Sequence, residues 1–336
     1  MKLANRNRFV LRSSSRLWVH MDRPDKAHGQ LVRSPRTKHD PWLLAAEIAT
    51  AGAAGVNPRF TKAARLMLEG RKQPATHVSE LASALATLEM ASGKTRKARK
   101  LFRRSLESPT DNSIAQAVWA RNLHLPFVID DQYLEFPNAF EAGSWSYYFD
   151  ENWRKAVEQC EFWQFDQPFS RRPGIQGSYV AAVALDDFVK CKALAELGLR
   201  SNPNDLTLLN NYAFALINLG EIHIARDSLS RMRSMQNTIP DRVAFFATRG
   251  LLAFRTGEFA EGRDSYTAAI ELARRSGDQR QLAIALYFFA KEELAQTRDA
   301  NSSLVSEALT TLRRIDKDPS PEMLRGKLID ACERLG

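Results

Sequence analysis

Small residues recur in this chain at fixed steps around a glycine, and this repetition restricts the possible folds more than any other feature. Around Gly220, the residue seven positions earlier is Ala213 and the residue five positions later is Ala225. The same steps around Gly257 and Gly93 again reach small residues. Small side chains let two helices cross closely, so each copy predicts a pair of antiparallel helices joined at the glycine. One pair cannot bury its apolar face alone, and the pairs must therefore stack.

Weaker copies of the pattern fill most of the remaining sequence. Asp22, Glu151 and Asp186 take the place of the glycine in three of them, and Pro58 takes it in the poorest copy. The copies start near residues 8, 44, 79, 137, 172, 206 and 243. The spacing between starts is 34–37 residues, except for one interval of 58 that contains an additional segment. Repetition at this period predicts an all-α fold of stacked helix pairs, an α-solenoid.

The spacing resembles that of the tetratricopeptide repeat family, from about residue 8 to residue 279, with the best copies at 206–232 and 243–274. The resemblance implies a right-handed superhelix whose concave groove is lined by the first helix of each pair. We therefore expect one solenoid over residues 1–279, followed by a helical cap over residues 280–336. Three further helices, at 281–297, 302–315 and 321–335, form this cap because they lack the repeat spacing.

Two parts of the chain depart from the pattern. Residues 113–123 look like a first helix without a matching second one, so we expect an irregular or extended insert at 124–136. The first repeat begins almost at Met1, without a capping helix before it. The N-terminal edge is therefore expected either to dock on another subunit or to continue an array that extends upstream.

No arrangement of residues typical of catalysis is present. Residues 92–95 resemble the end of a phosphate-binding loop, but Leu88 stands where that loop needs a glycine. None of the six histidines pairs with another histidine or a cysteine at metal-ligand spacing. The sequence therefore predicts no catalytic residue, no cofactor and no metal.

The cysteines and the hydropathy pattern indicate the expected location. Cys160, Cys191 and Cys332 are odd in number and far apart, which does not form a disulfide framework and fits a reducing cytoplasm. No run approaches the roughly 18 apolar residues that a membrane-spanning helix needs.

Positive charge is concentrated in the first third of the chain. Residues 1–104 contain 22 lysines and arginines against 7 acidic residues, although the whole chain has a net charge of only +9. The predicted basic patch consists of Arg12, Arg16, Lys94, Arg96, Lys97, Arg99, Lys100, Arg103 and Arg104. Such a patch is either a solvated face or a binding surface for an acidic protein or a nucleic acid.

Family geometry also implies a partner-binding groove on the first helices of the middle repeats. Its predicted residues are Glu141, Trp145, Tyr148, Phe149, Asn210, Phe214, Asn218, Phe254 and Arg255. An apolar and aromatic groove of this kind suits an extended or helical peptide. The alternative is that the insert or the C-terminal helices fill the groove.

These features favour a non-catalytic scaffold or adaptor that binds a partner protein or peptide through the groove, the N-terminal edge or both. The alternative function is a nucleic-acid-associated factor that uses the basic N-terminal third. The sequence does not name the partner.

Overall fold

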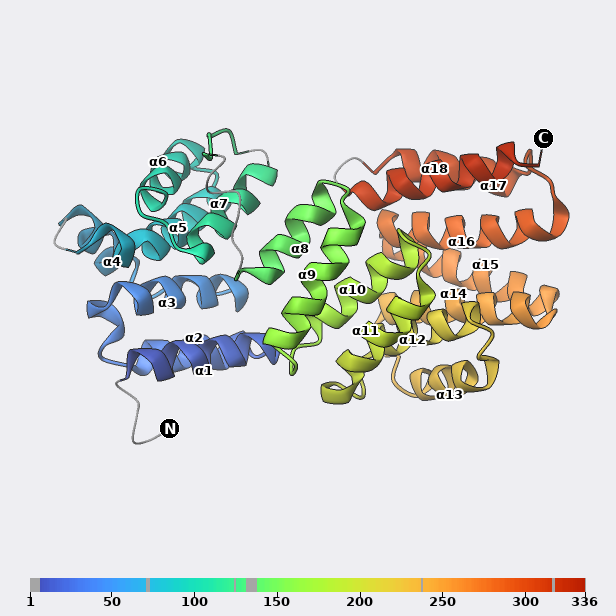
Figure 1. Cartoon of the computed structure of the whole chain (residues 1–336), viewed down its shortest axis with the longest axis horizontal. Helices are drawn as coiled ribbons and strands as arrows, with labels where there is room; N and C mark the ends of the chain where they lie inside the picture. Colours follow the sequence, from blue (N-terminus) through green and yellow to red (C-terminus); the bar gives the residue numbers. More distant parts are fainter. Residues whose placement is uncertain are drawn as a thin grey trace. The chain divides into compact units, whose positions relative to one another are not determined.

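The computed structural model describes residues 7–70, 73–123, 125–130, 138–236, 238–315 and 318–335. In these residues all regular secondary structure is helical, and consecutive helices pack side by side (Figure 1). The predicted all-α fold of stacked helix pairs is confirmed. The chain divides into two compact units, unit 1 (Met1–Ser146) and unit 2 (Tyr147–Gly336). The expected boundary at residue 279 stays a prediction.

Unit 1 contains three helix pairs and one single helix. Its helices are α1 (Arg8–His20), α2 (Pro24–Arg33), α3 (Pro41–Ala53), α4 (Thr61–Glu69), α5 (Ala75–Ala91), α6 (Thr95–Ser105) and α7 (Asp111–Asn122), with a short 3-10 helix, η2 (Thr37–His39), before α3. The first helices of the pairs contact one another in series, α1 with α3, α3 with α5, and α5 with α7. Helix α8 (Phe140–Phe149) runs across the boundary between the units.

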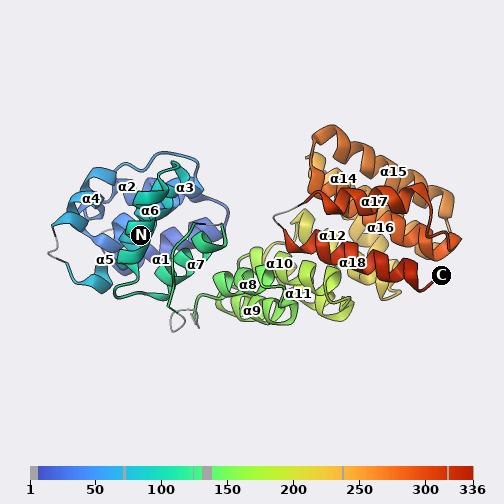
Figure 2. The same ribbon diagram turned by 90° about the horizontal axis from the view of Figure 1, so that it is seen from above.

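Unit 2 continues the alternation of first and second helices. Its helices are α9 (Trp153–Asp166), α10 (Arg172–Val183), α11 (Phe188–Ser201), α12 (Leu206–Asn218), α13 (Ile222–Arg233), α14 (Ile239–Thr256), α15 (Phe259–Ser276), α16 (Gln279–Thr297), α17 (Ser303–Arg313) and α18 (Pro319–Glu333). The pair α16–α17 extends the stack, because α16 packs on α14 as well as on α17. The last helix, α18, lies along both α16 and α17 (Figure 2).

The backbone conformation of the turn inside each helix pair explains why few residue types occur at the central position of the repeat pattern. Gly220 takes the left-handed conformation, with φ of 79°, and Asp22, Glu151 and Asp186 do so with φ between 52° and 57°. This region is strained for most L-residues but open to glycine. The predicted equivalence of these three acidic residues with the glycines is therefore confirmed.

The copy assigned to Pro58 is wrong in register. The left-handed residue of that turn is Gly55, with φ of 68°, because the proline ring locks φ near −65°. In the same copy, Ala64 is the fully buried small residue of α4, whereas the predicted Ala63 is only partly buried.

The expected insert at 124–136 is partly described. Residues 125–130 form no helix, and Leu125, Phe127 and Ile129 are buried while the residues between them are exposed. The Phe127 ring stacks on Phe102 of α6 at 5.4 Å, so this segment covers the core where a second helix would otherwise pack. Residues 124 and 131–136, together with the expected repeat start at 137, lie outside the described residues.

The cysteines pack as predicted for small apolar residues. Cys160 and Cys191 are buried between helices, and Cys332 is partly exposed. Burial raises the pKa of the Cys191 thiol to about 12, so this side chain stays a neutral thiol at physiological pH.

Candidate functional site

The first helices of unit 2 form a pocket of about 190 Å³. Phe214 of α12, Ala244 and Ala247 of α14, and Ile284 and Phe288 of α16 form most of its apolar lining. The Phe214 and Phe288 rings meet edge to face with their centroids 5.1 Å apart. First helices supply most of the lining because the second helix of each pair packs behind them. Two of the predicted groove residues, Asn210 and Phe214, belong to this lining.

Two amide side chains give this apolar pocket an unused hydrogen-bond donor and acceptor. The Thr248 hydroxyl donates to Asn210 Oδ1 at 2.7 Å, which leaves the Asn210 amide nitrogen without an acceptor in the described part of the chain. The Oε1 atom of Gln281 is buried and accepts no hydrogen bond from any described residue. Buried polar atoms are normally paired, so Gln281 Oε1 is suited to a ligand with a donor, and the amide nitrogen of the partly exposed Asn210 is an available donor beside it.

The other end of the predicted groove is covered by α18. Asp318, which caps that helix, accepts hydrogen bonds from the Tyr148 hydroxyl at 2.5 Å and from Arg280 Nε at 2.6 Å. Next to it, the hydroxyls of Tyr179 and Ser320 lie 2.9 Å apart. The start of the C-terminal helix is therefore attached to Tyr148 of α8 and Tyr179 of α10.

The contact continues along α18. Lys327 Nζ donates to the Val183 carbonyl at 3.0 Å and forms an ion pair of 2.5 Å with Asp186. Leu324 and Leu328 belong to the same hydrophobic cluster as the residues of α10. Tyr148 is only 4% exposed beneath the start of α18, so its side chain is not accessible to a peptide.

The substitution Asp318→Asn should loosen this attachment. Burial would raise the pKa of Asp318, but hydrogen bonds from Tyr148 and Arg280 outweigh it and hold the pKa below its ordinary value. The carboxylate therefore stabilises the contact at neutral pH, and this stabilisation is lost as the pH falls through the lowered pKa. Asparagine still caps the helix but removes the charge, so we expect hydrogen exchange in residues 319–333 to increase about tenfold at pH 7.

The matched control is Asp330→Asn on the same helix, where the exposed carboxylate makes no contact within the described residues. It should leave the exchange rate unchanged. Equal exchange in both variants and the unaltered protein would show that the Asp318 network does not hold α18.

The remaining predicted groove residues do not form one surface. Phe254 is 4% exposed and packs against Tyr266 and Phe289 inside unit 2, so it belongs to the core. Arg255 is held in a bidentate ion pair with the buried Glu292. Asn218 donates to the Phe214 carbonyl within its own helix, at 2.9 Å.

The other three predicted groove residues, Glu141, Trp145 and Phe149, lie on helix α8. Trp145 and Phe149 are each 41% exposed, and Glu141 is partly exposed. Of the predicted set, Asn210 and Phe214 are therefore the two residues that line the pocket.

The residues of the predicted basic patch also lie in different environments. Arg12 does not face solvent as a free cation: its Nη2 donates to Glu80 at 2.6 Å, and its guanidinium lies over Trp42. Arg16 lies on the same helix as Arg12. Lys94 is 3.7 Å from Glu89, and Arg104 donates to the Leu68 carbonyl at 2.6 Å. The five other cations lie on α6.

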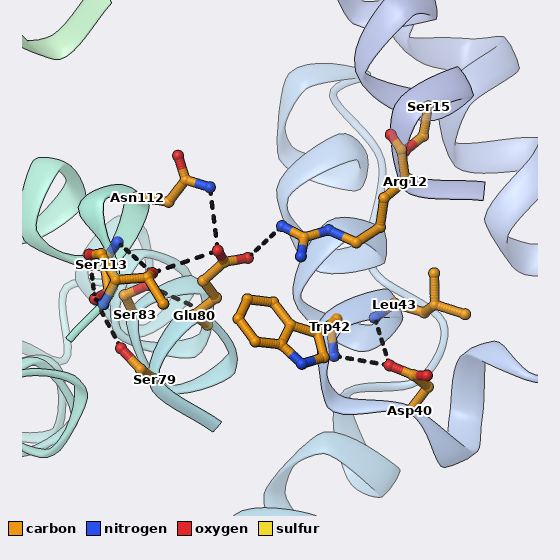
Figure 3. Close-up of polar contacts among 11 residues, drawn as sticks. Arg12, Ser15, Asp40, Trp42, Leu43, Ser79, Glu80, Ser83, Asn112 and Ser113 are labelled. Carbon is orange, nitrogen blue, oxygen red and sulfur yellow. Dashed lines mark hydrogen bonds and ion pairs between the residues drawn. The ribbon is translucent and has the colours of Figure 1, made fainter. Parts of the chain in front are cut away.

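Sequence reasoning missed the polar cluster around Glu80, which joins four first helices of unit 1 (Figure 3). Besides Arg12, the Glu80 carboxylate accepts from Asn112 at 3.1 Å and from the Thr110 hydroxyl at 3.3 Å. Trp42 of α3 lies beside it. The sequence did contain a signal for this cluster, because Glu80 lies inside the apolar run 78–86 and a buried carboxylate requires partners.

Searches for other kinds of site gave two negative findings for the described residues. No group of three or more His, Cys, Asp or Glu side chains is arranged to hold a metal ion. None of the described helices is both long and apolar enough to cross a membrane.

Comparison with known proteins shows no close relative. No protein-family profile matches the chain, and no curated protein matches its sequence. Among solved structures, the crystal structure of yeast Tom70 aligns with 93% of this chain at 16% sequence identity and a TM-score of 0.40. The alignment covers 64% of the Tom70 chain, so this protein spans less than two thirds of that structure.

Proposed function

We propose that this protein is a non-catalytic interaction scaffold of tetratricopeptide-like repeats, and that the pocket of unit 2 binds a peptide segment of a partner protein. The observation that carries the proposal is the combination of an apolar pocket with the unpaired Oε1 atom of Gln281 and the amide nitrogen of Asn210, which donates to no described residue. The left-handed residues between the paired helices support the repeat family. No disulfide joins Cys160, Cys191 and Cys332 to one another, which supports a reducing, cytoplasmic environment.

A peptide matches this pocket in both its side chains and its backbone. The pocket of about 190 Å³ that Phe214 and Phe288 help to line has room for an apolar side chain. Each peptide backbone unit carries one N–H donor and one C=O acceptor, which are the groups that Gln281 Oε1 and the Asn210 amide nitrogen lack. The ligand we expect is therefore a short segment with an apolar anchor and an accessible backbone, and no reaction is required.

The test is the substitution Ala244→Trp, which fills the pocket from α14. Peptides are first selected from a random 12-residue phage-displayed library on the unaltered protein, and their affinities are then measured by fluorescence anisotropy. We expect selected peptides to share an apolar position and to bind the variant at least tenfold more weakly, a loss of about 1.4 kcal/mol. Gln281→Leu should weaken binding less, because it removes one hydrogen bond and keeps the apolar floor.

The control variant is Ala193→Trp, which adds the same side chain at an exposed position of α11 that does not line the pocket. It should bind the selected peptides with unchanged affinity. Peptides that bind the Ala244→Trp variant as tightly as the unaltered protein would place the binding surface elsewhere and refute the pocket as the site.

A further inference from the structure

We propose that unit 1 binds the phosphate backbone of a double-stranded nucleic acid through the outward side of α6. The surface consists of Arg96, Lys97, Arg99, Lys100 and Arg103, and we refer to it as the α6 basic face. It is separate from the pocket of unit 2, so neither proposal depends on the other.

The packing of α6 decides where these cations point. Ala98, Phe102 and Ser105 are completely buried and form the inner stripe of the helix. The five cations occupy the remaining sides, and all of them except the partly exposed Arg99 are exposed. Residues three and four positions apart lie on the same side of a helix, so Arg96, Lys100 and Arg103 form a row. The 11-residue helix is about 16 Å long, which gives one continuous cationic strip.

No acidic residue neutralises this strip within the described structure. None of the five cations forms an ion pair with a described residue, in contrast to their neighbours Lys94 and Arg104, which have partners. Three cations on second helices of unit 2 pair with a carboxylate of the next repeat: Lys192 with Glu221, Arg263 with Glu293, and Arg274 with Glu307. The α6 basic face lacks this pairing, although like charges four residues apart disfavour the helix.

The chemistry of the surface favours nucleic acid over an acidic protein. Protein interfaces bind through buried aromatic and apolar anchors and are depleted in lysine. The outward side of α6 exposes no large apolar side chain and carries two lysines. Contact with phosphates needs no apolar anchor and depends on positive charge. Unit 1 supplies this charge, since it contains 23 basic and 13 acidic residues, a net charge of +10, whereas unit 2 has a net charge of −1.

The same surface favours a duplex over a single strand. Proteins that hold single strands stack the bases on aromatic side chains. The aromatic residue of α6 is Phe102, which is fully buried and stacked on Phe127. A duplex presents its phosphates outward and keeps its bases stacked on one another, so a purely cationic helix is sufficient to bind it. We expect binding that does not depend on base sequence.

The experiment measures the anisotropy of a fluorescein-labelled 20-base-pair DNA duplex of mixed sequence between 50 and 200 mM NaCl. If all five cations contact phosphates, the logarithm of the affinity falls with the logarithm of the salt concentration with a slope of about −4.5. The variant Arg96→Gln, Lys100→Gln, Arg103→Gln should bind at least tenfold more weakly at 50 mM. Its slope should be smaller in magnitude by about 2.7.

The matched control is Arg200→Gln, Arg226→Gln, Arg233→Gln, which changes the net charge equally at exposed positions of unit 2 without ion pairs in the described residues. It should bind the duplex within twofold of the unaltered protein. Circular dichroism should show equal helicity for all three proteins. If the triple α6 variant loses helicity, the single variants Lys97→Gln and Arg103→Gln replace it, each with an expected slope change of about 0.9.

Four results would overturn the proposal. They are no binding at 50 mM NaCl, equal loss of affinity in both triple variants, tighter binding of the single strand than of the duplex, and displacement of the duplex by polyglutamate of equal charge as effectively as by unlabelled duplex. The last result would identify an acidic protein as the partner. Failure of duplex binding leaves peptide binding by the Ala244 pocket unaffected, and the two proposals are therefore tested separately.

Discussion

Gly250→Val is expected to destabilise unit 2 by about 3 kcal/mol, because overpacking a close helix crossing costs roughly this much. A Cβ atom on Gly250 would lie 2.7 Å from Cδ2 of Tyr266, a ring that is itself only 1% exposed. On the opposite helix, a Cβ atom on Gly262 would meet Phe254 at 2.6 Å. The two glycines thus let α14 and α15 approach with their aromatic rings interlocked, and valine forces the helices apart.

The measurement is urea unfolding combined with hydrogen exchange of peptides from α14 and α15. The control is Gly326→Ala on α18, where an added Cβ meets no atom within 4 Å. That variant should gain up to about 1 kcal/mol, because alanine favours a helix more than glycine does. Unchanged unfolding of Gly250→Val would show that α14 and α15 do not cross in this register.

Glu80→Ala is expected to destabilise unit 1 by about 2–3 kcal/mol. The Glu80 carboxylate is buried and accepts hydrogen bonds from Arg12 on α1, from Asn112 on α7 and from Thr110 just before α7 (Figure 3). Removal of one partner from a buried charge pair costs about 3–5 kcal/mol, and the partial exposure of Arg12 places this site near the lower limit. Loss of the carboxylate also removes the ion pair that joins α1 to α5.

Three variants separate the contributions at this cluster. Urea unfolding of Glu80→Ala should show a lower midpoint, together with faster hydrogen exchange in α1. Glu80→Gln keeps an acceptor for Asn112 and Thr110 but loses the charge opposite Arg12, so its effect should be intermediate. The exposed Glu107, which has no partner in the described structure, serves as the control, and Glu107→Ala should unfold as the unaltered protein does. If Glu80→Ala behaved like that control, Arg12 would have to be hydrated instead of paired.

The sequence predicted the features that depend on spacing along a helix. Asp186 occupies a turn that demands a left-handed residue. The positions seven before and five after most of these turns are small because two helices cross there, with Tyr179, seven before Asp186, as an exception. Ala213 and Ala225 are accordingly buried with no exposed surface. The Pro58 copy failed because the small residues Ala51 and Ala63 fit the spacing around Pro58, although proline cannot adopt the required φ and the nearby Gly55 does.

The groove was predicted less well because exposure depends on what packs against a first helix from elsewhere in the chain. Phe254 has the position of a groove residue, yet Phe289 of the following first helix covers it. Tyr148 is covered by Asp318, 170 residues later in the sequence. No periodic pattern encodes such a contact, because α18 lies outside the repeat spacing.

By itself, therefore, the sequence determined the helix pairs, their turns and the inward stripe of α6, since all of these follow from the 3.6-residue period and from the steric limits of single residues. The tertiary structure decided which side chains are left for a partner. Packing brought Arg12 to Glu80 and α18 to Tyr148, and it left the Gln281 Oε1 atom and the Asn210 amide nitrogen beside an apolar pocket without a hydrogen-bond partner in the described residues. The physical reason is that hydrogen bonds and ion pairs form between whichever groups packing brings within about 3 Å, and packing joins segments that are distant in the chain.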